Sequence, residues 1–567
     1  MGTLFSTISI GRAGLFAAQI QLDTTAHNIS NVNTDGFSRQ RVDMTTFAPN
    51  VREFGVIGRG PKIGGIERIR DEFLDTVYRE QVAGLGLSEI TARFFNQIED
   101  IFQEPGGEGL TSRIDIFFDA LNDFASSVED LPTRVALLAE AETVASTFRQ
   151  VSGRLATLRT VANEEVRDLV PEINSLAAQI AESNRAIGRA ENTGNKANDL
   201  RDKRDLLLDK LSRIANVTIG QGDGSSVNVL LGGDELVVGV RTRTLITQTD
   251  ATIDPDRPDL LSVYFQDNLL QATILDGDLA GAIQMRDIEL RNLEDEFDQL
   301  AAAMIEEVNA IHAQGNGLQP YAAPMSASYT VSDPAAALDS AGLPFAVQDG
   351  SFDLVAYDAS GAIVETVTVP VTAAATTLND IAAAISGSAS FSAAVNASNV
   401  LTITPAAGIR YTFANDTSNF PASLGLNNFF TGSDAANIGV NQDLLDTPAL
   451  VSGAFSLDIL DTGDNTAALA LAALRNAPVM SGGTESFNEF LESTIVKAGV
   501  SSKANQDSLE VVSSFVDDFD RRRKEISGVS LDEEVSSLVL FQRAFEASAR
   551  TITVADQMLQ TVLNMAR

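Results

Sequence analysis

The two residue types that most often act as nucleophiles, bases or transition-metal ligands, cysteine and histidine, are scarce in this chain. The 567 residues include no cysteine and only two histidines, His27 and His312. The lack of cysteine excludes a disulfide framework, a thiolate zinc site and a cysteine nucleophile. We interpret His27, beside Asn28 at an expected helix end, as a capping or interface residue rather than a base. We interpret His312 as a helix-terminal residue, where a cation suits the helix dipole.

Three further stretches resemble ligand sites but lack the residues that such sites need. Glycine-rich 220–224 and 232–233 lack the lysine and helix start of a phosphate loop, so they predict hairpin turns. The segment 458–464, DILDTGD, lacks the ligand spacing and closing glutamate of an EF-hand loop. The basic run 521–524 follows acids four residues earlier, which predicts a salt-bridged helix face. The sequence therefore predicts no catalytic, cofactor-binding or metal-binding residues, and a structural protein rather than an enzyme.

Charge and hydropathy exclude two classes of partner. The formal net charge is −37, which argues against non-specific binding to nucleic acid or to anionic lipid. There is no apolar run of about 18 residues, so we expect no membrane insertion. The first residues lack a basic region, a continuous apolar region and a small-residue cleavage site. If the protein leaves the cell, we expect export without a cleaved signal peptide.

The elements at the two ends carry complementary packing patterns. Apolar residues recur every seven positions from Ile8 to Ile29, and the small residues Gly11 and Ala18 would let another helix approach closely. The segment 530–533, SLDE, has the pattern of a capping box at the start of a last helix. The pattern of the first helix is also compatible with an ordinary amphipathic helix on a globular core. The heptad of the last helix consists of Leu531, Leu538, Phe545, Ile552 and Leu559.

Between the two ends the periodicity changes several times. Apolar residues at three- and four-residue steps predict helix over about 73–215, with a continuous rod near 130–190 about 90 Å long. Strand alternation marks 38–70 and 217–246, and helix returns at about 279–313. After an Ala/Pro/Ser-rich linker, 345–430 is β-rich with one short helix at 378–385. Helix resumes at about 465.

This organisation predicts a mainly α, elongated, multi-domain fold. It would combine coiled-coil-like terminal helices, a long helical bundle body and inserted β-rich, α+β domains. The length agrees with three or four domains. The expected division is a terminal paired-helix domain (1–40 with 528–567), a helical body (41–215 with 270–318 and 446–527), a small β-rich domain (216–269) and an outer α+β insert (320–445).

The segment 27–40, HNISNVNTDGFSRQ, resembles the N-terminal signature of the bacterial flagellar rod, hook and hook-associated proteins. The last helix resembles the closing helix of the same family, and its SGVSLDEE opening fits the hook-associated branch best. The segments 197–217, 308–318 and 424–445 also resemble that branch, whereas Gly-Asn-Gly-Leu at 315–318 departs from its usual Gly-x-Asp-Leu. The matching motif residues are Asn28, Asn31, Asn33, Thr34, Gly36, Ser38, Arg39 and Gln40, with Phe37 in a tyrosine position and Ser30 in an alanine position.

The resemblance implies a structural protein at the junction of flagellar hook and filament, outside the cell. It implies as partners a ring of identical subunits, the hook protein, a second hook-associated protein on the filament side, and an export chaperone at the C-terminal helix. The Asn-rich segment would end the first helix, with Asn33 and Asp35 tolerating left-handed φ and Gly36 making the turn. Two alternatives remain open: a flagellar hook or distal-rod protein, and a secreted acidic adhesin or carbohydrate-active protein.

Overall fold

The fold comes from a computed structural model that describes residues 2–52, 55–102, 109–192 and 194–565. Its contacts divide the chain into two compact units, each built from separate stretches of sequence. The four-domain division expected from the sequence stays a prediction. Unit 1 comprises Met1–Arg93, Val161–Asp287 and Lys503–Arg567, and unit 2 comprises Phe94–Thr160 and Ile288–Ser502.

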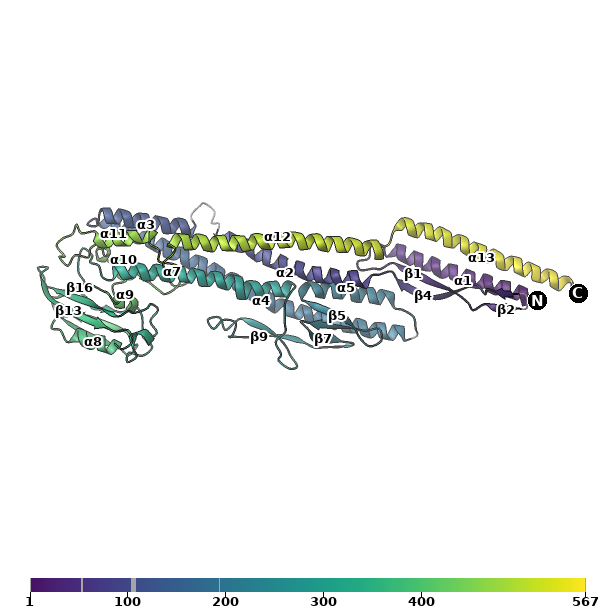
Figure 1. The fold of residues 1–567 in the computed structure, drawn as a ribbon, viewed down its shortest axis with the longest axis horizontal. Helices are drawn as coiled ribbons and strands as arrows, with labels where there is room; N and C mark the ends of the chain where they lie inside the picture. The colour runs from purple at the N-terminus through teal and green to yellow at the C-terminus, as the bar shows by residue number, and fades with distance from the viewer. Residues whose placement is uncertain (1, 53–54, 103–108, 193, 566–567) are drawn as a thin grey trace. The chain divides into compact units, whose positions relative to one another are not determined.

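Long helices dominate both units, and the mainly α class is confirmed (Figure 1). The continuous helix expected near 130–190 is α4, which has 61 residues and contains Pro171. Pro171 therefore lies within the helix and does not end it. The five longest helices are α1 (Gly2–Ser30), α2 (Glu72–Phe102), α4 (Leu131–Glu191), α12 (Phe487–Ser527) and α13 (Leu531–Met565).

In unit 1, the two ends of the chain lie side by side as α1 and α13 (Figure 1). Small residues allow this close approach: a Cβ on Gly11 would lie 2.8 Å from Ile552 Cγ1, and one on Gly14 would lie 2.8 Å from Ser548 Oγ. The predicted approach of another helix at Gly11 is thus confirmed. Strands β1 and β4 pair antiparallel and pack against α1. The strands that follow α1 are β1 (Gln40–Thr46), β2 (Asn50–Arg52), β3 (Gly55–Ile57) and β4 (Pro61–Arg68).

The rest of unit 1 contains α5 (Asn198–Ile214), α6 (Asp278–Gln284) and two small sheets, the first of which lies where strand alternation predicts it and the second of which lies mostly beyond that stretch. One sheet has the order β5-β6-β7-β8, and the other pairs β9 with β10. The strands are β5 (Val217–Gln221), β6 (Val227–Leu231), β7 (Asp234–Val238), β8 (Arg241–Thr242), β9 (Leu245–Thr249) and β10 (Leu261–Phe265).

Unit 2 contains an α+β region with its own hydrophobic core, formed by buried residues between Met325 and Leu426. Two three-stranded sheets, β13-β12-β16 and β11-β15-β14, pack with α8 (Leu378–Ser386), whose start Thr377 and Asp380 cap reciprocally. The strands are β11 (Met325–Ser326), β12 (Gly350–Tyr357), β13 (Ile363–Val371), β14 (Phe391–Val395), β15 (Leu401–Pro405) and β16 (Arg410–Ala414). The neighbouring helices are α3 (Leu110–Ser126), α7 (Leu290–His312), α9 (Phe420–Leu424), α10 (Gln442–Asp446) and α11 (Thr466–Ala473), with the short pair β17 (Phe430–Thr431) and β18 (Gly439–Val440).

The helix expected over 279–313 is interrupted by a π-helical turn at Met285–Glu289, between α6 and α7. Within this turn the Arg286 side chain is fully buried, and its guanidinium donates to Asn163 Oδ1 (2.9 Å) and to the Leu261 carbonyl (2.6 Å). Those partners come from α4 and β10. Periodicity along one helix therefore gave no sign of the turn.

His312 ends α7 as expected, but it is not a cation. Its buried ring bonds the Asn427 carbonyl through Nδ1 (2.8 Å), and its Nε2 accepts the Ser452 N–H (3.0 Å). Burial, assisted by the nearby Arg134 guanidinium, lowers its pKa to about 4. The neutral imidazole ties α7 to two loops more than 100 residues away. The expectation of a helix-end cation is wrong.

We expect this histidine to make the protein less stable below neutral pH. The unfolded chain takes up the proton near pH 6.5, whereas the folded chain resists it to about pH 4. The stability that neutral His312 contributes is thus present above pH 6.5 and lost as pH falls, by up to about 1.4 kcal/mol per pH unit. Urea unfolding followed by circular dichroism measures the free energy of unfolding at each pH. Between pH 6.5 and pH 4, this free energy should fall less steeply in His312→Gln than in the unchanged protein. Because carboxylates titrate in both proteins, only the difference between the two slopes of free energy against pH reports on His312. Equal slopes would contradict the prediction.

Candidate functional site

The turn after α1 has the left-handed residue where the sequence places it, at Gly36 (φ +74°). Thr34 N–H donates to the Asn31 carbonyl and Phe37 N–H to the Thr34 carbonyl, which closes the chain reversal. Neither Asn33 nor Asp35 has a positive φ, so that part of the expectation is wrong. A single glycine suffices to reverse the chain here, and residues 33–35 remain exposed.

Asn28 is the buried centre of the motif. Its amide pairs with the backbone of Gln40, donating to the carbonyl (2.9 Å) and accepting from the N–H (3.0 Å). The same Nδ2 donates to Glu534 Oε2 at 3.1 Å. One side chain therefore joins the end of α1, the start of β1 and the first turn of α13.

Arg39 completes this contact from the other side. Its Nε donates to Glu534 Oε1 (2.7 Å) and its Nη1 to Glu533 Oε2 (2.8 Å), while its backbone N–H donates to the Ser527 carbonyl. The Glu534 side chain is 3% exposed, so a positive charge and amide donors offset its desolvation. We call Asn28, Arg39 and Glu534 the clasp.

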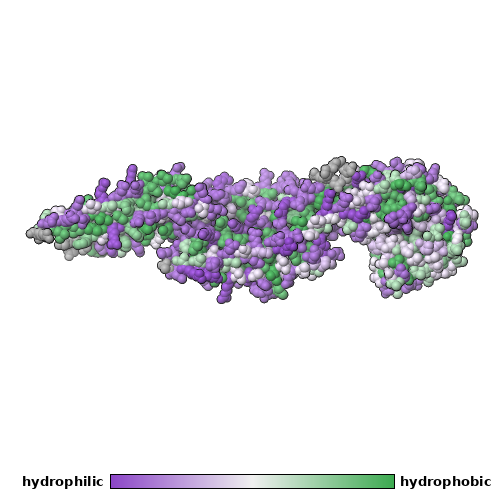
Figure 2. Space-filling view, turned by 180° about the vertical axis from the view of Figure 1, so that it is seen from behind, coloured by the Kyte–Doolittle hydropathy of each residue, from purple (hydrophilic) through white to green (hydrophobic). Residues whose placement is uncertain are grey.

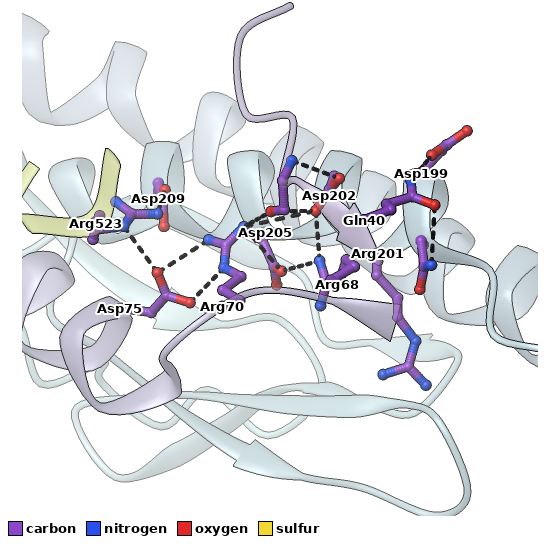
Figure 3. Close-up of polar contacts among 12 residues, drawn as sticks. Gln40, Arg68, Arg70, Asp75, Asp199, Arg201, Asp202, Asp205, Asp209 and Arg523 are labelled. Atoms are coloured by element: carbon purple, nitrogen blue, oxygen red, sulfur yellow. Dashed lines mark hydrogen bonds and ion pairs between the residues drawn. The ribbon is translucent and has the colours of Figure 1, made fainter. Parts of the chain in front are cut away.

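Four aspartates on α5 form a second group of acceptors (Figure 3). They stand three or four residues apart, which places them on one face of the helix. Asp199 accepts from Gln40 Nε2 (2.7 Å), and Asp202 accepts from Ser38 N–H (3.0 Å) and Oγ (2.8 Å). We call Asp199, Asp202, Asp205 and Asp209 the aspartate row.

Arginines from three other segments complete the row. Arg68 Nη1 lies 2.7 Å from Asp202 Oδ1 and 2.8 Å from Asp205 Oδ2. Asp209 pairs with Arg79 (2.6 Å) and Arg523 (2.8 Å). Each arginine thus ends on a carboxylate from a distant part of the sequence.

Asp205 shows the electrostatic balance of the row. Burial by itself raises the pKa of its carboxyl, but the charges of Arg70, Arg68 and Arg79 outweigh burial and hold the pKa below its usual value. Asp205 is therefore an anion at neutral pH, and the row is a set of fixed charge pairs. Such pairs fix geometry more than they add net stability.

The predicted seam on α13 is half-buried along most of its length. Ile552 lies against Gly11 of α1, and Leu538, Phe545 and Leu559 share its seven-residue spacing and partial burial. Leu531, at the start of the helix, is 48% exposed. The assignment of these residues and of the motif residues to a subunit interface stays a prediction.

The basic run at the end of α12 is partly as predicted. Arg522 pairs with Asp518 (2.8 Å) and Lys524 with Asp520 (2.6 Å), as i,i+4 spacing predicts, whereas Arg521 lies nearer Asp518 than Asp517. Arg523 instead points inward to Asp75 and Asp209 (Figure 3). Sequence reasoning missed Arg523 and the aspartate row, although the regular aspartate spacing was visible.

In residues 2–52, 55–102, 109–192 and 194–565, no group of three or more histidine or acidic side chains is arranged to hold a metal ion. Over the same ranges, no helix is both long and apolar enough to cross a membrane.

Comparison with known families first defines a class. The model described as "Flagella basal body rod protein" matches residues 8–37, and that described as "Flagellar basal body rod FlgEFG protein C-terminal" matches 523–565. These ranges contain most of α1 with the turn that follows it, and the end of α12 with α13. The chain therefore has the terminal segments of the flagellar rod and hook class.

The similarity extends to the interior and to relatives that align over the full length. The model described as "Flagellar hook-associated protein FlgK helical domain" matches 95–322. Flagellar hook-associated protein 1 of Escherichia coli (strain K12) is 26% identical, over 99% of this chain and 100% of that protein. Its namesake in Bacillus subtilis (strain 168) is also 26% identical, over 100% of this chain and 99% of that protein. The chain is therefore similar along its whole length to flagellar hook-associated protein 1 of both organisms.

A solved structure supports the fold. The flagellar hook junction protein FlgK from Burkholderia pseudomallei aligns with a TM-score of 0.50 at 17% identity. The alignment covers 81% of this chain and 100% of that one.

We expect loss of the Asn28 amide to loosen the start of α13. Asn28→Ala leaves the buried Gln40 backbone and Glu534 short of partners, which should cost about 1–3 kcal/mol of the free energy of unfolding. Hydrogen exchange should rise at 28–40 and 531–540. The matched control is Asn33→Ala, in the exposed part of the same turn, which should change stability by less than about 0.5 kcal/mol. Equal effects of the two variants would show that the clasp has no special role.

Proposed function

We propose that the protein is a structural subunit of the bacterial flagellum that joins hook to filament, as the matched family models and the similarity along the full length support. The observation that carries the proposal is a second apolar stripe on α13. Val554 follows Ile552 by two residues, about 200° around the helix axis, so it faces away from the seam with α1. This outer stripe consists of Leu540, Val554, Met558 and Val562, which are 63%, 46%, 45% and 38% exposed.

The outer stripe indicates a further partner for α13. A surface helix with one neighbour needs one apolar face and has polar residues elsewhere. On α13 the inner face is already used by α1, yet Met558 and Val562 extend the outer stripe at four-residue steps from Val554. Figure 2 shows apolar residues exposed over the terminal helices. Exposed apolar patches of this kind mark interaction surfaces.

We propose that identical subunits form a ring through their terminal helices, with the hook protein on one side and a second hook-associated protein on the filament side. An export chaperone would cover α13 before assembly, and the protein would reach the outside of the cell by flagellar export. The role is structural and not enzymatic. The clasp and the aspartate row support it, because their charged side chains are engaged in holding segments of the chain together.

The alternatives have less support. A hook or distal-rod protein would share the terminal segments, but the match over 95–322 is to a hook-associated helical domain. A secreted adhesin or carbohydrate-active protein does not account for relatives that align over the whole chain.

A charge on the outer stripe should block filament assembly. We expect Met558→Asp to fold and be secreted but to leave hooks without filaments in a deletion strain, because burying the carboxylate costs about 2–4 kcal/mol per subunit. Electron microscopy gives filament counts, and secretion is measured separately because the chaperone would bind the same helix. Thr553→Asp, exposed outside the stripe, is the matched control. Normal filaments with Met558→Asp would argue against the stripe as an interface, and normal filaments in the deletion strain itself would argue against the junction role.

A further inference from the structure

The aspartate row joins two parts of unit 1. We call α1, strands β1–β4 and α13 the terminal module; it continues into α2 through residues 69–71 and into α12 through 528–530. Ser38, Gln40 and Arg68 lie in the turn and strands of this module. Arg79 lies on α2 and Arg523 on α12. Both connections are only three residues long. The aspartates of α5 lie beside them and contact side chains from both parts.

The row is divided between these two parts along its length. Asp199 and Asp202 accept from Gln40, Ser38 and Arg68 of the terminal module. At the other end, Asp209 holds Arg79 and Arg523 of α2 and α12.

Asp205 stands between these ends and is shared by both parts. It lies 2.8 Å from Arg68 of the terminal module and 3.5 Å from Arg70, in the connection to α2. Arg70 in turn lies 2.5 Å from Asp75, which also holds Arg523 at 2.8 Å. A charge network therefore runs from the strand β4 to the end of α12 (Figure 3).

Beside the charge network, the connection is open rather than packed. A groove of about 980 Å³ lies between the turn after α1, α2, α5, the end of α12 and the start of α13, and Arg70, Asp209 and Arg523 of the network line it. Its lining includes apolar side chains that are only half-buried, among them Phe37, Leu206, Val516 and Val529. Gly528, in the connection between α12 and α13, lines it too. Apolar packing on this side therefore leaves space into which the terminal module could tilt.

We propose that the aspartate row sets the angle at which the terminal module leaves the rest of unit 1, with Asp202 and Asp205 as positioning residues. Charge-assisted hydrogen bonds are directional, so several of them along one rigid helix define an orientation that half-buried apolar contacts do not. The biological meaning rests on the proposed function, because subunits can close into one ring only if every module leaves at the same angle. The row would supply that uniform angle before the outer stripe is covered.

The chain has no cysteine, so two introduced cysteines can carry spin labels at known positions. The distance between the labels then reports the orientation of the terminal module. Ser514→Cys on α12 and Gln542→Cys on α13 are exposed positions on either side of the Gly528 connection. Double electron–electron resonance on the full-length monomer should give one narrow distance distribution. Asp202→Asn, which keeps the shape and removes the charge, should broaden or shift it by several ångströms while the circular dichroism melt stays intact.

The matched control is Asp517→Asn, the same change at an exposed position of α12, which should leave the distribution narrow. If Asp202→Asn does not fold, Arg68→Gln replaces it, because Asp202 and Asp205 then keep Ser38 and Arg70 as partners. An unchanged narrow distribution in a folded variant would overturn the proposal, as would a fall in melting temperature without any change of distribution. The monomer measurement does not depend on filament assembly. The proposal about the angle can therefore be wrong while the junction role is right, and the junction role can be wrong while the proposal about the angle is right.

Discussion

The register of the terminal module depends on one buried carboxylate, Glu534, because segments from near the two ends of the chain meet at it. Asn28 and Arg39 approach it from a segment about 500 residues earlier. A carboxylate that is 3% exposed is tolerated only with a positive charge and hydrogen-bond donors beside it. Any shift of α13 along α1 would remove those donors. The clasp therefore selects one register among those that the heptads alone would permit.

Apolar and polar contacts divide the work in the terminal module. The seam between α1 and α13 supplies close contact, which the missing side chains of Gly11 and Gly14 make possible. The clasp and the aspartate row supply direction. The outer stripe of α13 takes part in neither set of contacts and stays exposed, and under the proposed function it is the surface that contacts another chain.

In unit 2, His312 has a role similar to that of Glu534 in unit 1. Its neutral ring donates to one loop and accepts from another, so α7 is fixed against segments distant in sequence. In both units, a polar side chain at a helix end is buried and satisfied by groups from elsewhere in the chain. Both were visible in the sequence only as residues suited to a helix terminus.

The sequence by itself determined what is local and periodic. Seven-residue spacing predicted the terminal helices and the inner face of α13, three- and four-residue steps predicted α4, and alternation predicted the strands, because these patterns follow from helix and strand geometry. The motif at 27–40 also indicated the family, since its residue types and their spacing lie within one short stretch of chain. Gly36 was predictable as the turn residue, since a left-handed φ favours glycine.

Only the tertiary structure decided which polar residues matter. Asn28, Arg39 and Gln40 were in the motif, but their partners Glu534 and Asp199 lie far away in the chain, and no local pattern connects them. The inward turn of Arg523, the π-helical turn at Met285–Glu289 and the neutral state of His312 were missed for the same reason. The charge state and direction of a buried side chain depend on what packs around it, and that is fixed by contacts between distant segments rather than by neighbours in sequence.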